Sequence, residues 1–173
     1  MTITSHICRG NYHSTYFTSG PYDSVADYVF AEENVDALLL EYDDERSGGF
    51  APLAKVSPDK KVVLGLITTK SAELEKKEDV IARIHEAAKY IPLDRLCLSP
   101  QCGFASCDVG NKLTEKEQWA KLKLVKEIAE EDLGKNRVRK RYKQHKKQKT
   151  VERIRVKAWL FMFNKIDKHA YLV

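Results

Sequence analysis

The segment VDALLLEY, residues 35–42, is a short apolar run closed by charged residues. This pattern is typical of a strand that is buried in a parallel sheet. The segment KVVLGLIT, residues 61–68, repeats the pattern. Farther out, TITSHIC at residues 2–8 contains β-branched residues, and DRLCLSP at residues 94–100 has the pattern of a fourth strand. These four segments therefore predict four strands.

Three helices are predicted around these strands. Residues 22–33, YDSVADYVFAEE, have apolar residues at helical spacing, with Asp23 or Ser24 available as the N-cap. Residues 114–134 open with a T-x-x-E capping box and end on glycine. Residues 77–91, KEDVIARIHEAAKYI, are amphipathic, and Pro92 follows them. The apolar stripe of this last segment consists of Val80, Ile84, Ala87, Ala88 and Ile91.

Strands that alternate with helices predict an α/β chain with a parallel sheet. Four βα units are half of an eight-stranded (β/α)8 TIM barrel. Half a barrel leaves two open sheet edges, which are unfavourable for a monomer. We therefore expect either a fragment of a larger barrel or a chain that pairs with another half, including a second copy of itself.

The charge of the chain divides near Gly134. Residues 1–134 carry 16 Lys and Arg against 23 Asp and Glu, whereas residues 135–173 carry 14 against 2. This asymmetry predicts a domain over 1–134 and a basic tail over 135–173. The first interpretation of the tail is sequence that is not native to the fold. A nucleic-acid-binding or acidic-partner-binding arm, with Tyr142 and His145 among its basic residues, is the second, and a membrane-surface segment is the third.

Composition limits the setting of the protein. The chain has 173 residues, 43% of them hydrophobic and 32% charged, which is ordinary for a globular domain. No apolar run reaches the roughly 18 residues of a transmembrane helix, and MTITSHICRG lacks the features of a secretion signal. We therefore expect a cytoplasmic protein without a membrane partner. Its cysteines are then reduced thiols, free for metal binding or catalysis. They are Cys8, Cys97, Cys102 and Cys107.

Polar residues follow three of the four predicted strands. His6 and Cys8 end the first strand, Glu41 ends the second, and Cys102 comes just after the fourth. Because the carboxyl ends of barrel strands meet at one face, these side chains could converge. One imidazole, two thiolates and one carboxylate make a four-coordinate zinc site.

Each candidate has a simpler structural interpretation. Cys97 is expected to be a small buried residue of its strand, and Cys107 a thiol of a loop. Glu41 heads a charged run, EYDDERSGG, that would normally be a solvated loop. His85 is expected on the surface of its helix, and His13 could line the site, although nothing in the spacing requires it.

Four motifs, HICRGN, LEYDDERSG, KVVLGLIT and LCLSPQCGFAS, resemble the C-terminal part of the cobalamin-independent methionine synthase family. The resemblance runs from about residue 3 to about residue 133 and is closest to short, single-domain bacterial members. It implies the C-terminal half of a (β/α)8 barrel. It also implies four Zn²⁺ ligands, which are His6, Cys8, Glu41 and Cys102.

The resemblance further implies methyl transfer to homocysteine, giving methionine, with zinc lowering the pKa of the substrate thiol. Full-length synthases have a functional histidine where this chain has Thr68. The methyl donor, a folate or another carrier, is therefore left open. The alternative is an inactive barrel remnant that acts as a binding module through its basic tail.

Overall fold

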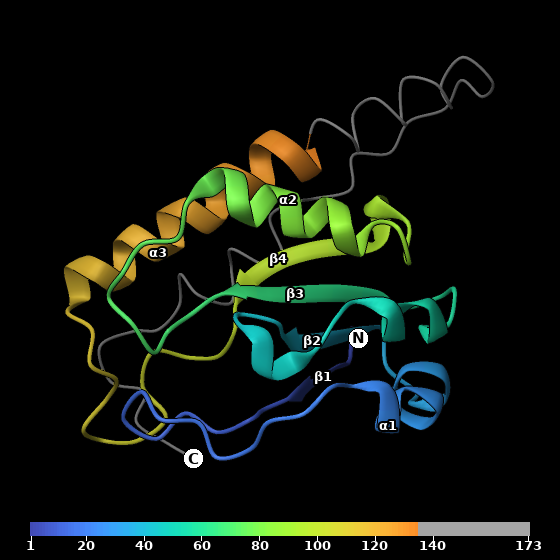
Figure 1. Ribbon diagram of the computed structural model, residues 1–173, viewed down its shortest axis with the longest axis horizontal. Helices are drawn as coiled ribbons and strands as arrows, with labels where there is room; N and C mark the ends of the chain where they lie inside the picture. Colours follow the sequence, from blue (N-terminus) through green and yellow to red (C-terminus); the bar gives the residue numbers. More distant parts are fainter. Residues whose placement is uncertain (135–173) are drawn as a thin grey trace. The chain divides into compact units, whose positions relative to one another are not determined.

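The computed structural model describes residues 1–134, which form a four-stranded parallel sheet with helices (Figure 1). The predicted tail over 135–173, and with it the boundary near Gly134, lies outside the described residues. The strands are β1 (Thr4–Ile7), β2 (Ala37–Glu41), β3 (Lys61–Ile67) and β4 (Leu96–Pro100). All three pairings are parallel, and the spatial order follows the sequence. The predicted α/β fold with four parallel strands is therefore confirmed.

Crossover segments connect the strands, because neighbouring parallel strands cannot be joined by a tight turn. Helix α1 (Asp23–Val25) lies between β1 and β2, α2 (Lys77–Ala87) lies between β3 and β4, and α3 (Glu115–Ile128) follows β4. Helices α2 and α3 lie side by side on one face of the sheet, along β3 and β4 (Figure 1). With every crossover running back to the start of the next strand, the carboxyl ends of all four strands meet at one edge of the sheet.

The two long helices follow their sequence signals. In α3, Glu117 N–H donates to the Thr114 hydroxyl (3.3 Å) while the Glu117 carboxylate accepts from Thr114 N–H (2.7 Å), so the predicted capping box is present. A π-helical segment, Ala129–Gly134, extends α3. Helix α2 and the turn after it bury the predicted stripe against the sheet, with Ala88 partly buried at its margin. The fully buried members are Val80, Ile84, Ala87 and Ile91.

A helical segment is present where residues 22–33 predict one, but its form and its N-cap differ from the prediction. Helix α1 has three residues, a π-helical turn, Ala26–Phe30, continues it, and the helical residues Ala31 and Glu32 follow. Its N-cap is Tyr22, without a side-chain capping bond, rather than Asp23 or Ser24. Tyr22 is 1% exposed and its hydroxyl is bonded to the backbone of β2, so tertiary contacts rather than a polar cap fix the start of this helix.

An aromatic cluster packs beside the carboxyl end of β2. Ring centroids are 5.5 Å apart between Tyr22 and Phe30, 5.0 Å between Tyr22 and Tyr42, and 4.7 Å between Tyr42 and Phe50. All four rings are buried and tilted against one another, an arrangement that stabilises aromatic contacts beyond the area they bury. The cluster therefore provides a rigid support for the residue that ends β2, Glu41.

Within residues 1–134, none of the helices has the length and apolar character to span a bilayer.

Candidate metal centre

Three predicted ligands lie together at the carboxyl edge of the sheet. His6 is in β1, Cys8 follows that strand, and Cys102 follows β4. Their ligand atoms all lie within 4.8 Å of one another, and the two sulfur atoms are 4.0 Å apart. One imidazole and two thiols at this spacing are a donor set that suits Zn²⁺. Folding therefore brings together residues that are about 95 positions apart in the sequence.

The fourth predicted ligand, Glu41, lies on the His6 side of this group. Its Oε1 is 3.7 Å from His6 Nε2. The side chain is fully buried, yet neither carboxylate oxygen has a hydrogen-bond partner within 3.5 Å among residues 1–134. Burial raises the pKa of Glu41, against the opposing effects of the nearby Arg9 backbone N–H, Lys70 and His6. A buried carboxylate without a partner is unfavourable unless a cation completes its surroundings, so the residues present fit a bound metal ion.

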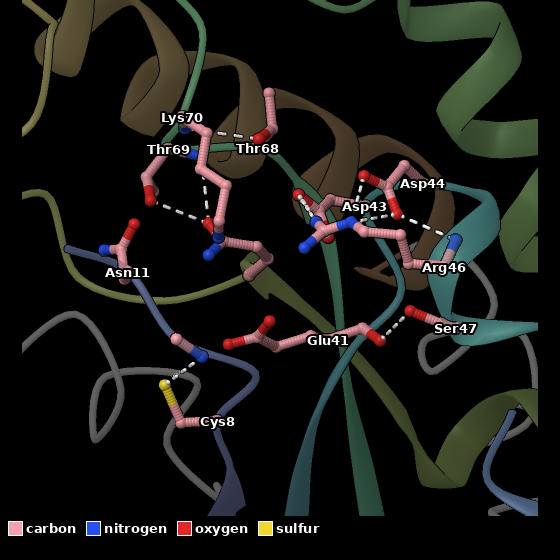
Figure 2. Close-up of polar contacts among 12 residues, drawn as sticks. Cys8, Asn11, Glu41, Asp43, Asp44, Arg46, Ser47, Thr68, Thr69 and Lys70 are labelled. Atoms are coloured by element: carbon pink, nitrogen blue, oxygen red, sulfur yellow. Dashed lines mark hydrogen bonds and ion pairs between the residues drawn. The ribbon is translucent and has the colours of Figure 1, made fainter. Parts of the chain in front are cut away.

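The backbone of Glu41 is held from both sides. The Tyr22 hydroxyl donates to the Glu41 carbonyl (3.1 Å) and accepts from the Glu41 N–H (3.0 Å). The Ser47 hydroxyl donates to the same carbonyl (2.6 Å; Figure 2). These bonds do not involve the carboxylate, so they position Glu41 while leaving both of its carboxylate oxygens available to a ligand.

Two asparagines join the loops that carry the thiols. Asn11 Nδ2 donates to the carbonyl of Gly103 (2.7 Å), which is next to Cys102. Asn111 Nδ2 lies within hydrogen-bond distance of Asn11 Oδ1 (3.0 Å) and of the carbonyl of Thr69 (2.8 Å). The loops after β1, β3 and β4 are therefore tied to one another. This network fixes the Cys8 loop relative to the Cys102 loop before any metal binds.

The Cys102 thiol is in an unfavourable place for an unpaired negative charge. Burial raises its pKa to about 11, and the neighbouring Cys8 and Glu41 add to the effect. The thiol is therefore protonated near neutral pH in the metal-free protein. A divalent cation would reverse this preference, because metal ions stabilise the thiolate that coordinates them.

The other sequence candidates lie outside the group. Cys97 in β4 and Cys107 in a loop are partly buried. His85 is 51% exposed and its Nε2 lies 3.1 Å from Asp132, as expected for a surface residue of α2. His13 Nδ1 lies 3.0 Å from the carbonyl of Gly110 and therefore supports the loop contact instead.

Several residues of the site were not singled out as candidates from the sequence. Asn11, Thr69, Lys70 and Asn111 lie in loops after the strands, and Gln101 follows β4 directly. The Thr69 N–H (2.9 Å) and hydroxyl (2.7 Å) both donate to Gln101 Oε1. No spacing rule selects such residues, because they become neighbours only when the parallel strands align.

The sequence of this edge belongs to a known family. Residues 2–131 match the family described as the catalytic domain of cobalamin-independent synthases. The chain belongs to the cobalamin-independent methionine synthase family. The match includes the strands, the loops and all four predicted ligands, so the resemblance noted from the motifs is confirmed.

Two curated relatives come from Bacillus subtilis, the uncharacterized proteins YxjG and YxjH. They are 58% and 59% identical to the chain over 130 residues. Those residues make up 75% of this chain but 34% of each relative. The chain thus spans about a third of the length of the curated family members it matches.

Solved structures of the family agree with the fold. One, from Listeria monocytogenes, is described as a vitamin-B12-independent methionine synthase. It is 40% identical, has a TM-score of 0.55, and is matched over 75% of this chain and 34% of its own. A B12-independent methionine synthase from Shewanella, solved in complex with selenomethionine, is 22% identical with a TM-score of 0.57, over 80% of this chain and 39% of its own. The four-stranded sheet of this chain is thus similar to part of a family structure.

Proposed function

We propose that this chain supplies the zinc-binding part of a methyltransferase that converts homocysteine to methionine. The observation that carries the proposal is the buried Glu41 carboxylate, which has no hydrogen-bond partner in the described part of the chain, residues 1–134. It lies 3.7 Å from His6 of the His6–Cys8–Cys102 group. Membership of the family supports the reaction class. Because the chain matches about a third of the length of its curated relatives, we propose it as one part of the catalytic domain.

The proposed ligands are His6, Cys8, Glu41 and Cys102. A bound Zn²⁺ would supply Lewis acidity toward the sulfur of a thiol substrate. The chain itself would provide the geometry, since the asparagine network holds both thiol loops and Tyr22 holds the backbone of Glu41. Thiolate ligands keep the ion electron-rich, which suits activation of a sulfur nucleophile without redox chemistry.

The proposed substrates are homocysteine and a methylated donor, a folate or another carrier. The end of β3 bears on the choice of donor. Thr68 stands where the resemblance implies a histidine, and its N–H donates to Glu75 Oε1 (2.8 Å). Glu75 is itself held by the fully buried Lys121 of α3, whose Nζ lies 3.0 Å from Glu75 Oε2. Thr68 therefore anchors a loop and offers no imidazole for proton transfer to a folate leaving group.

Metal analysis of the purified chain tests the site. We expect about one equivalent of zinc in the wild-type chain and loss of zinc in His6→Ala and Cys102→Ala. Cys97→Ala is the matched control, because Cys97 is a partly buried thiol of β4 outside the group. A wild-type chain without stoichiometric zinc, or one whose zinc survives both substitutions, would contradict the ligand assignment.

Methyl transfer is measured separately from metal binding. Methionine formation from homocysteine is followed with a methylated folate and with methylcobalamin as donors. Turnover above background that is lost in Cys102→Ala supports the proposed reaction and identifies the donor class. Zinc binding without turnover by either donor would leave the metal site intact and contradict the reaction for this chain on its own.

A further inference from the structure

The ammonium group of one lysine lies near the proposed metal centre. Lys70 follows β3, and its Nζ atom is buried and has no hydrogen-bond partner within residues 1–134. Figure 2 shows its side chain running from the end of β3 toward the Glu41 carboxylate. A buried ammonium group without an acceptor is unfavourable for folding. Its presence therefore calls for an explanation beyond stability.

Neither of the two carboxylates on which Lys70 acts electrostatically forms an ion pair with its ammonium group. Lys70 lowers the pKa of both Glu41 and Asp43, although burial is the largest influence on each and raises the pKa. Asp43 is already paired with Arg46, whose Nη2 lies 3.3 Å from its Oδ1. Glu41 makes no hydrogen bond to Lys70. The ammonium group is thus close enough to act electrostatically on the centre but is not used by an ion pair.

The net charge of the proposed metal site gives a reason for the position of Lys70. Two thiolates and one carboxylate around a divalent ion leave a site with one net negative charge, and a thiolate substrate would raise this to two. Lys70 is the lysine or arginine whose charge acts on Glu41, and it offsets the negative charge that a substrate thiolate adds. The guanidinium of Arg9 lies against the Tyr22 ring instead, 4.4 Å from its centroid.

We propose that Lys70 is the charge partner of the substrate thiolate, so that it favours an anionic sulfur ligand at the metal over a neutral ligand. This inference rests on the proposed function. Lys70 acts through the electric field of its ammonium group and requires no contact with the substrate. The other charged groups near this edge are engaged elsewhere, since Arg46 pairs with both Asp43 and Asp44 and the Arg9 guanidinium lies against the Tyr22 ring.

Ligand binding to the cobalt-loaded 173-residue chain tests the proposal. The visible absorption of bound Co²⁺ reports binding of homocysteine, a thiolate ligand, and of imidazole, a neutral one. We expect Lys70→Met to weaken homocysteine binding about 10-fold, the order expected for a unit charge acting across several ångströms of protein. The affinity of Lys70→Met for imidazole should stay within about 2-fold of the wild-type affinity, because a neutral ligand has no net charge for the ammonium group to attract.

Two further variants complete the experiment. Lys70→Arg keeps the charge and should recover most of the homocysteine affinity. Lys61→Met removes an exposed charge at the opposite end of β3 and should change neither ligand. Equal weakening of both ligands by Lys70→Met would show that Lys70 only maintains the shape of the site, and unchanged homocysteine binding would also overturn the proposal. A chain that takes up no Co²⁺ fails the proposed function itself, which metal analysis identifies before any ligand is added.

Discussion

Gly65 is the residue at which strand packing and the metal centre are most directly coupled. It lies in β3 at the register position of Glu41 in β2. A Cβ atom at this position would lie 2.7 Å from Gln101 Cα, 2.9 Å from the Leu40 carbonyl oxygen and 3.3 Å from the Pro100 carbonyl oxygen. All three are backbone atoms, so no side chain can rotate away to make room. Gly65→Ala must therefore move β2 and β4 apart at the ends that carry the predicted ligands.

The size of the effect follows from these contacts. Overpacking of a folded interior typically lowers the free energy of unfolding by about 1–3 kcal/mol, and contact with rigid backbone places Gly65→Ala near about 3 kcal/mol. The smaller backbone entropy of alanine in the unfolded chain offsets at most about 1 kcal/mol. Displacing the residues that hold metal ligands in place typically weakens metal binding by roughly 10-fold or more. We therefore expect both lower stability and lower zinc affinity.

Urea unfolding and competition with a chelator measure the two effects. Gly49→Ala is the matched control, because Gly49 lies in an exposed loop and an added Cβ would meet nothing within 4 Å. Its unfolding midpoint and zinc affinity should equal those of the wild type. If Gly65→Ala also unfolds at the wild-type midpoint and binds zinc as tightly, the close approach of the three strand ends is not what sets the geometry of the centre.

Three further outcomes are expected. Because the pKa of Cys102 is raised to about 11, zinc binding near pH 7 should release the proton of this thiol. The heat of zinc binding measured by calorimetry should then depend on the ionisation enthalpy of the buffer. A Cys102→Ala chain should release fewer protons. Tyr22→Phe leaves the buried Glu41 N–H without its acceptor and should lower the free energy of unfolding by about 1–3 kcal/mol in denaturant titrations. Thr114→Ala removes the capping box of α3 and should lower it by about 1 kcal/mol, with unchanged zinc affinity as the sign that the effect is local.

The strands were predictable because they are buried on both faces. β3 has six consecutive buried residues after Lys61, and such a run has few alternatives to a central parallel strand. The capping box at Thr114 was equally visible, since its two bonds join residues three positions apart. Residues 22–33 were harder, because the burial of Tyr22 against β2 decides the local geometry there and no local pattern records it.

The metal group was predictable only in part. His6 and Cys8 form a recognisable pair, and Cys102 stands at a strand end, so each had a signal of its own. Glu41 begins a charged run that would normally be solvated, yet it is fully buried. Asn111 supports the thiol loops through bonds to residues 42 and 100 positions away, and sequence spacing carries no information about contacts at that range.

The carboxyl edge of the sheet also explains why this part of the chain is not optimised for stability. Among residues 1–134, buried polar atoms without partners occur at the ends of three strands, on Glu41 at the end of β2, Lys70 after β3 and Gln101 after β4. Each such group lowers the stability of a folded domain by about 1–3 kcal/mol relative to a satisfied one. Apolar residues at these positions would remove that penalty without altering the strands. Their presence on three separate elements that meet at the thiol group is therefore better explained by a ligand that completes them than by the requirements of folding.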